Sequence, residues 1–225
     1  MNTLASLFDI HTTFFSVWQY DMSYLEFFGT IFTIWCVWLT TRAKILSWPV
    51  GLIGSVLYLF LFYQIQLYSD VFEQVYFLIT GALGWFMWVS RAEERKQDDS
   101  TVLVSICTQQ ERLVVLGGVV VGTAILAFIT LHLSVWFPAY FPEPVSMPIL
   151  DAGTTAMSFI AQWLLMRKKI ENWVLWIVVD AIDIGLYWYK GVKFVSVEYI
   201  LFFCMAISGL RQWLAIRKQH PTTSV

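Results

Sequence analysis

Seven apolar stretches, most of them close to the 20 or so residues that a bilayer-spanning helix needs, decide what this chain can fold into. They lie at 26–41, 48–66, 71–90, 113–135, 149–166, 172–190 and 195–215. Inside a bilayer every backbone amide needs a partner within the protein, so these stretches are expected to be helices. Only 13% of the residues are charged, against about 25% in soluble domains. The sequence therefore predicts an all-α integral membrane protein with seven transmembrane helices.

The basic residues give these helices a direction. Twelve of the fourteen Lys and Arg residues fall in connections on one side or in the C-terminal part, and only Lys190 and Lys193 fall on the other side. Basic residues collect in cytoplasmic loops. We therefore expect the N-terminus outside, the C-terminus in the cytoplasm and an odd number of spans.

The chain is repeated at a shift of 125 residues without a gap. The shift pairs Trp38 with Trp163, Arg42 with Arg167, Trp48 with Trp173, Gly84 with Gly209, and Trp88 with Trp213. One helix between two three-helix repeats restores the direction of the chain, so the repeats are parallel. Parallel repeats are an architecture of transporters, with the site between the halves near the midplane. A duplicated scaffold without a pathway is the alternative.

This reasoning divides the chain into seven parts. We expect an N-terminal interfacial segment (1–25), a first three-helix repeat (26–90), a cytoplasmic loop (91–112), a linker helix (113–135), an outer loop (136–148), a second repeat (149–216) and a cytoplasmic tail (217–225). Four prolines in the outer loop prevent it from continuing a helix.

The sixth stretch carries two acids far from either end. Its polar and aromatic residues are spaced three, four, three and four, which places them on one helix face: Trp173, Trp176, Asp180, Asp183 and Tyr187. An ionised carboxylate at the bilayer centre costs about 3 kcal/mol even on the lenient insertion scale, and marks a functional site. Alternatively, Asp180 is protonated and bonded to a neighbouring helix, and Asp183 stabilises a lysine near the outer surface.

The fifth stretch carries a second polar face. Thr155, Ser158 and Gln162 follow Asp151 at spacings of four, three and four. They are candidate ligand contacts, although hydroxyl side chains also join transmembrane helices to one another. Trp48, Trp88 and Trp213 lie at helix ends and are predicted to anchor in the membrane interface. Trp173 fits either that role or ligand stacking.

A buried carboxylate beside indole and phenol rings suits a cationic aromatic ligand, because the rings stack and the acid balances the charge. No GxxxxGK[ST] or GxSxG motif occurs, and the three histidines are not clustered. We therefore expect a transporter rather than an enzyme, without cofactor or metal. A net charge of −2 gives no basic surface for nucleic acid.

The chain resembles the Pnu family of bacterial vitamin transporters over nearly its whole length. The resemblance rests on "WPVGLIGSVLYLFLFYQIQLYSD" (48–70), "GALGWFMW" (81–88), "ENWVLWIVVD" (171–180) and "GLYWYKG" (185–191). It implies a three-one-three arrangement of helices similar to SWEET proteins and a homotrimer. It also implies facilitated diffusion, with the vitamin trapped by a cytoplasmic kinase as a step towards NAD.

The resemblance also implies a substrate. The family's Trp-x-x-Trp element falls on Trp173 and Trp176, and Asp180 stands where the riboside transporters have Asn. Gly81 and Leu83 replace the family's Asn and Tyr in the third helix. Relatives similar to thiamine carriers have Asp at the Asp180 position. Nicotinamide riboside is the favoured substrate, thiamine is the alternative, and another nucleoside, a proton symporter or a membrane-embedded enzyme stay open.

Overall fold

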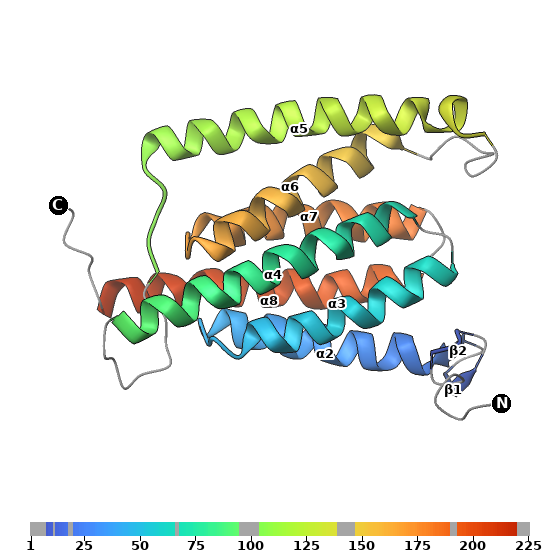
Figure 1. Ribbon diagram of the computed structural model, residues 1–225, viewed down its shortest axis with the longest axis horizontal. Coiled ribbons are helices and arrows are strands. Elements are labelled where there is room, and N and C mark those ends of the chain that lie inside the picture. Colours follow the sequence, from blue (N-terminus) through green and yellow to red (C-terminus); the bar gives the residue numbers. More distant parts are fainter. Residues whose placement is uncertain are drawn as a thin grey trace. The chain divides into compact units, whose positions relative to one another are not determined.

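The computed structural model describes residues 8–10, 12–17, 20–65, 68–94, 104–138, 147–189 and 193–219. These residues form a two-stranded hairpin followed by helices of 18 to 28 residues (Figure 1). The elements are β1 (Thr13–Val17), β2 (Tyr20–Ser23), α2 (Tyr24–Thr41), α3 (Ser47–Gln64), α4 (Tyr68–Glu94), α5 (Gln109–Trp136), α6 (Pro148–Met166), α7 (Glu171–Tyr189) and α8 (Lys193–Gln219). All seven predicted spans are therefore helical, with bounds within a few residues of those expected.

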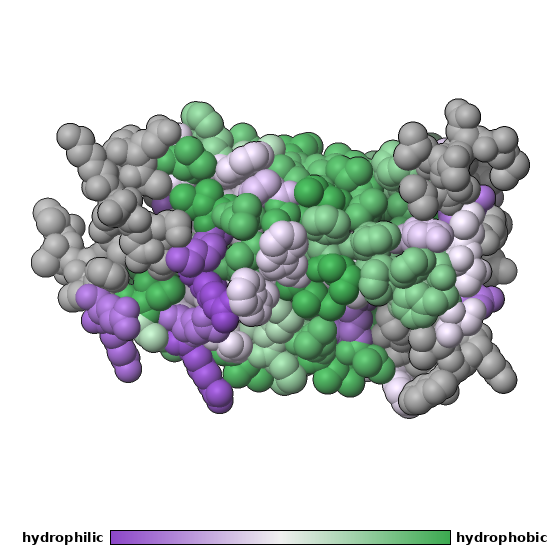
Figure 2. All heavy atoms as spheres, turned by 90° about the horizontal axis from the view of Figure 1, so that it is seen from below, coloured by the Kyte–Doolittle hydropathy of each residue, from purple (hydrophilic) through white to green (hydrophobic). Residues whose placement is uncertain are grey.

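Five of these helices are long and apolar enough to cross a membrane, namely α2, α3, α5, α6 and residues 195–219 of α8. In the face shown in Figure 2, hydrophobic side chains cover the middle and hydrophilic ones gather towards the left-hand end. Many large apolar side chains are exposed, including Phe60, Phe86 and Leu113. Exposed apolar surface on this scale is expected where a protein faces lipid. The crossing of the membrane by α4 and α7 stays a prediction.

The predicted loops differ from the structure at their edges. Helix α4 continues to Glu94, and α5 begins at Gln109, so both ends of the predicted cytoplasmic loop 91–112 are helical. The Thr108 hydroxyl accepts a hydrogen bond from the Glu111 backbone N–H, and the Glu111 carboxylate accepts one from the Thr108 backbone N–H. This capping box explains why α5 begins before the apolar run. Most of the outer loop 136–148 and residues 220–225 of the tail lie outside the described residues.

The N-terminal segment contains the antiparallel hairpin β1–β2, which the sequence analysis does not anticipate. Ser23 ends the second strand and caps α2, because its hydroxyl accepts from the Glu26 backbone at 3.2 Å. Phe14 packs against Tyr24 and Phe27 at ring-centroid distances of 4.6 and 5.1 Å. The hairpin is therefore fixed to the start of α2 by a cap and an aromatic cluster.

The chain divides into two compact units, residues 1–103 and 104–225. In the first unit, α3 packs against both α2 and α4. In the second unit, each helix from α5 to α8 packs against the next along the chain. The inner helices, α3 in the first unit and α6 and α7 in the second, are thus each covered by the helices before and after them in the chain.

The same turn occurs once in each unit. Ala43 and Lys168 both adopt the left-handed conformation, with φ of 51° and 62°. The following residue donates to a carbonyl five positions back, at 3.1 Å from Lys44 to Leu39 and 2.9 Å from Lys169 to Leu164. This is the bonding of a Schellman motif, which ends one helix and lets the next begin within a few residues.

A tryptophan pair also occurs once in each unit. Trp48 and Trp88 meet edge to face at 5.3 Å, and Trp173 and Trp213 do so at 5.7 Å. All four side chains are at most 5% exposed. The prediction that Trp48, Trp88 and Trp213 anchor in the membrane interface is therefore wrong, because their rings pack within the protein.

Two glycines of α5 have a packing role inside the chain. A Cβ at Gly118 would lie 3.2 Å from Ile160 Cδ1, and one at Gly122 would lie 3.3 Å from Ala156 Cβ. Spaced four residues apart, they form a GxxxG pair, which in membrane helices can join either two subunits or two helices of one chain. In the structure the pair brings α5 and α6 of one chain together, as small residues do in membrane helices.

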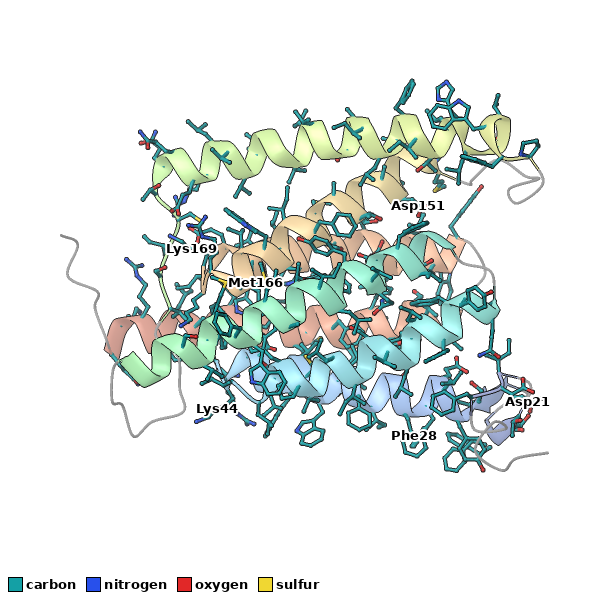
Figure 3. All side chains as sticks on the ribbon, in the orientation of Figure 1. Asp21, Phe28, Lys44, Asp151, Met166 and Lys169 are labelled. Atoms are coloured by element: carbon teal, nitrogen blue, oxygen red, sulfur yellow. The ribbon has the colours of Figure 1, made fainter. Side chains whose placement is uncertain are left out.

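The segment before α5 pairs with the turn between α6 and α7. Ser105 donates to the Lys168 carbonyl and accepts from the Ile170 backbone, both at 2.9 Å. Lys169 binds the Ile106 carbonyl at 3.2 Å and Glu111 at 2.9 Å. Figure 3 shows Lys169 at this turn. We call residues 105–112 and 168–171 the clasp, because they tie the start of α5 to the α6–α7 turn.

Glu171 holds the clasp from the first turn of α7. One carboxylate oxygen accepts from Nε and Nη2 of Arg112 at 3.2 and 3.0 Å, and the other accepts from the Cys107 backbone at 2.9 Å. Burial and then the Glu171 carboxylate raise the pKa of the Cys107 thiol to about 12. Cys107 is therefore protonated at neutral pH and serves as a small apolar side chain.

We expect Glu171→Ala to destabilise the protein more than Arg112→Ala. Arg112 is 59% exposed, so losing its ion pair costs less than about 1 kcal/mol. Glu171→Ala also leaves the buried Cys107 N–H without an acceptor, which adds about 1–3 kcal/mol. Melting temperatures in detergent measure both effects, at roughly 2–4 °C per kcal/mol. Equal decreases for the two variants would show that the Cys107 contact contributes nothing.

Candidate functional site

Helix α7 buries the face that carries its two acids. Asp180 and Asp183 are 4% and 5% exposed, whereas Val178, about 160° around the helix from Asp180, is 40% exposed. Asp180 lies nine residues beyond Glu171, roughly 13 Å along the axis at 1.5 Å per residue. That depth is close to the middle of a hydrocarbon core about 30 Å thick. The carboxylates thus point into the protein, and where α7 crosses the membrane as predicted from the sequence they lie near the middle of the bilayer.

The Asp180 carboxylate makes no hydrogen bond or ion pair within the described residues. Its nearest charged neighbour is Asp183, one turn further along α7. Within the described residues, the side-chain polar atoms that are fully enclosed and make no hydrogen bond belong to Trp48, Asn172 and Trp173. The Asp180 oxygens are not among them. These oxygens therefore border a space that a water-sized group can reach. Two acids one turn apart repel each other, and a positive ligand between or beside them would relieve that repulsion.

The aromatic residues of this face differ in how tightly they are enclosed. Trp173 is 2% exposed, lies against Gly209 and Trp213, and has no partner for its indole N–H. Trp176, one turn nearer the membrane centre, is only partly buried. Stacking requires an accessible ring, so the half-buried Trp176 is better placed for a ligand than the enclosed Trp173. A substrate contact by Trp173 stays a prediction.

Tyr187 occupies the outer end of the same face and has a partner that the sequence analysis missed. Its ring stacks on Tyr199 of α8 at 5.3 Å and 17°. The start of α8 is fixed nearby, because the buried Ser196 hydroxyl donates to the Ile184 carbonyl at 2.7 Å. Tyr199 lies in the α8 apolar run at spacings of three and four from Phe202 and Phe203. That periodicity marks one helix face, but does not reveal which neighbouring helix the face meets.

The polar stripe of α6 is turned away from α5. Ala156 and Ile160 contact the glycines of α5, and Ser158 lies about 160° around the helix from Ala156. Ser158 is 5% exposed, and Thr155 and Gln162 are partly buried. Asp151 and Met166 mark the two ends of this helix in Figure 3. The three side chains make no hydrogen bond within the described residues, including any to Asp180, so their polar groups are available to a ligand.

This arrangement combines a buried carboxylate and a half-buried indole on α7 with hydroxyl and amide groups on α6 that make no hydrogen bond within the described residues, and the two helices pack together. The chemistry fits reversible binding of a polar cation better than a reaction, because no nucleophile–base pair is seen among the described residues. A family model described as nicotinamide mononucleotide transporter matches residues 23–215. The chain belongs to this family. It is accordingly a multi-pass membrane transporter and not an enzyme.

Relatives within the transporter family match over most of their length. The chain is 30% identical to the "Nicotinamide riboside transporter PnuC" of Escherichia coli, covering 92% of this chain and 91% of that protein. It is 26% identical to the "Riboflavin/roseoflavin transporter RibM" of Streptomyces davaonensis, and that match covers 95% of this chain and 92% of the relative. The named substrates of these relatives are vitamins or vitamin analogues with a flat aromatic ring.

A solved structure described as "Crystal structure of the Vitamin B3 transporter PnuC" has the same fold, with a TM-score of 0.66 and 26% identity. The match covers 88% of this chain and 83% of that chain. This chain therefore shares its helical architecture with a vitamin transporter of known structure.

Proposed function

We propose that this protein takes up a cationic aromatic vitamin, with nicotinamide riboside favoured, across the bacterial inner membrane. The observation that carries the proposal is Asp180, which is buried in α7 without a hydrogen-bond or ion-pair partner among the described residues. A bound cation would offset the desolvation of such a carboxylate. The pyridinium ring of nicotinamide riboside is a permanent cation, and relatives at up to 30% identity are named as its transporters.

In the proposed complex, Trp176 stacks on the positive ring while Asp180 balances its charge. Thr155, Ser158 and Gln162 donate to or accept from the sugar hydroxyls, as partly buried hydroxyl and amide groups can. Asp183 and Tyr187 shape the outer part of the path, and Trp173 supports the site from below while packed on Gly209. Thiamine is the second candidate, because its thiazolium ring is also a cation that Asp180 would attract.

We further propose that α2–α4 and α6–α8 are two parallel three-helix repeats joined by α5. The support is the repeated geometry, namely the Schellman turns at Ala43 and Lys168 and the edge-to-face tryptophan pairs of the two units. With the basic residues of the sequence assigned to the cytoplasm, the N-terminus is outside and the C-terminus inside. The family resemblance supports a homotrimer and trapping of the vitamin by a cytoplasmic kinase.

Calorimetry on the purified protein tests the substrate. We would titrate nicotinamide riboside, thiamine, riboflavin and the neutral nucleoside uridine in one panel. We expect micromolar or tighter binding of one cationic vitamin and none of uridine. If riboflavin alone bound, the charge argument would be wrong and the RibM relative would be the better guide to the substrate. If no vitamin in the panel bound, the transport proposal for these substrates would be overturned.

Uptake into proteoliposomes tests the mode of transport. Facilitated diffusion should bring the vitamin to equal concentrations on both sides without any imposed gradient. Collapsing a proton gradient should leave the rate unchanged within experimental error. Accumulation above the outside concentration, driven by an inward proton gradient, would show a symporter in place of the proposed uniporter.

A further inference from the structure

The second unit contains a cavity that the proposed transport path does not use. Its volume is about 240 Å³, and it lies between α5, α6 and α7. Its apolar lining comes from Val115, Leu116 and Val119 of α5, Met157 of α6 and Leu175 of α7, and Arg112 lies at one end. We propose that this groove binds one acyl chain of an anionic phospholipid, with the lipid phosphate at Arg112.

The position of the groove separates it from the candidate substrate site. Leu175 lies five residues before Asp180, and so about 140° around α7 from it. The groove is also smaller than the roughly 300–1,000 Å³ of typical small-molecule pockets. Apart from Arg112 and its ion-pair partner Glu171, its lining is apolar, and it contains no aromatic ring on which a vitamin could stack. An occupant of this groove is therefore mainly apolar.

Two fixed contacts on α5 create the groove. The clasp holds the start of α5 through Glu111 and Arg112. Further along, Gly118 and Gly122 bring α5 against α6 at van der Waals distance. Val115 and Leu116 lie between the clasp and Gly118, and Val119 lies between the two glycines. The helix cannot close this gap without breaking the clasp or the glycine contacts.

The groove opens onto the most lipid-like surface of the chain. Only 6% of the span in α5 is buried, and Leu116 itself is 63% exposed. Between Leu113 and Val135 the exposed residues of this helix are all apolar and mostly aliphatic, so hydrocarbon is the medium that covers them at least cost. From Arg112 to Val119 the groove follows α5 for roughly 10 Å at 1.5 Å per residue. A lipid chain can therefore enter from the side and lie along the helix.

An unused guanidinium donor at the end of the groove favours an anionic headgroup, although the basic residues there, Arg112 and Lys169, are each paired with an acid. The Arg112 guanidinium gives Nε and Nη2 to Glu171, while Nη1 has no partner within the described residues. More than half of its side chain is exposed. Lys169 lies beside Glu111 at the same end. A phosphate accepts readily from such a partly used guanidinium, and each basic residue near a membrane surface contributes about fivefold to anionic lipid binding.

Native mass spectrometry of the full-length, delipidated protein tests this proposal. The probes are palmitoyl-oleoyl phosphatidylglycerol and the matching phosphatidylcholine, added in separate titrations. We expect one phosphatidylglycerol retained per chain, with a several-fold preference over phosphatidylcholine. Arg112→Ala should reduce that preference about fivefold while leaving phosphatidylcholine binding unchanged. An Arg112→Ala variant with undiminished preference would overturn the headgroup assignment.

Groove-filling variants test the acyl-chain contact. Val119→Trp from α5 and Leu175→Trp from α7 should each weaken retention of both lipids at least tenfold, since several methylenes lose their contacts. Val121→Trp is the matched control, because Val121 is 57% exposed and does not line the groove. Vitamin binding by the two groove variants should be unchanged. That result would show that both variants are folded.

The same spectra distinguish a bound lipid from a second copy of the chain as the occupant of the groove. If a neighbouring subunit fills the groove, Val119→Trp should shift the mass of the oligomer and leave lipid retention as it was. Equal lipid retention by Val119→Trp, Leu175→Trp and Val121→Trp would likewise overturn the proposal.

Discussion

Asp180→Asn should weaken binding of nicotinamide riboside by roughly 10- to 100-fold, which corresponds to about 1.4–2.7 kcal/mol. The change keeps the shape of the side chain and its capacity to accept a hydrogen bond, but removes the negative charge. Asp180 is 4% exposed, and a carboxylate screened this little from a cation attracts it far more strongly than one in bulk water. Isothermal titration calorimetry on wild-type and variant protein measures the effect directly.

Asp151→Asn is the matched control for this experiment. It also removes one carboxylate, but Asp151 lies in the first turn of α6, is only partly buried and is absent from the proposed ligand contacts. Its affinity for the vitamin should stay within about twofold of wild type, as expected for a remote and partly solvated charge. Asp183→Asn should fall between the two. Equal affinities for wild type and Asp180→Asn would show that the charge at position 180 does not recognise the substrate.

The helices of this protein could be predicted because each rests on a local signal. An apolar run of bilayer length fixes a helix whatever surrounds it, and the structure moves its ends by only a few residues. Where it moves them, a short-range motif explains the change. Thr108 and Glu111 form a capping box that is legible in the sequence, and it starts α5 four residues before the predicted span.

The hairpin before α2 carried a weaker signal. β1 is rich in aromatic and β-branched residues, which favour strands. However, no Asn-Gly or Asp-Gly pair marks a tight turn there. A strand of this length is also ambiguous without its partner, since the pairing that stabilises it lies outside the segment.

The buried tryptophans show what a single sequence leaves undetermined. A tryptophan at a helix end fits both a membrane interface and a helix–helix contact, and only the facing residue separates these roles. In this chain the facing residues are Gly84 and Gly209, which recur at the same 125-residue shift as Trp48 and Trp173. Reading those pairs together would have predicted the contact. The clasp had no such signal, because Glu171 and Arg112 are 59 residues apart.

The candidate site was predictable in part for the same reason. Spacing alone placed Asp180, Asp183 and Trp176 on one face of α7, and the structure buries both acids. Spacing could not show that Trp173 is enclosed between Gly209 and Trp213, or that Tyr199 stacks on Tyr187. Those are contacts with α8, and they depend on how two helices are rotated relative to each other.

Gly209→Ala should lower the melting temperature by roughly 3–10 °C, from an overpacking cost of about 1–3 kcal/mol. A Cβ at position 209 would lie 2.6–2.7 Å from three atoms of the Trp173 ring. The ring cannot move away easily, because it is 2% exposed and meets Trp213 edge to face. Helix α7 must then shift from α8 and carry Asp180 with it, so vitamin affinity should fall as well. Thermal melting in detergent and calorimetry measure the two effects.

The second unit also supplies the matched control, Gly185→Ala. Gly185 lies in α7, is exposed and has open space where a Cβ would stand, so this change should be neutral or stabilise the helix by up to about 1 kcal/mol. Trp173→Phe in the Gly209→Ala background should restore part of the lost stability, because the smaller ring makes room for the methyl group. A melting temperature for Gly209→Ala equal to that of Gly185→Ala would mean that Trp173 does not pack on Gly209. In that case its ring would be free for the stacking role that the sequence alone allowed.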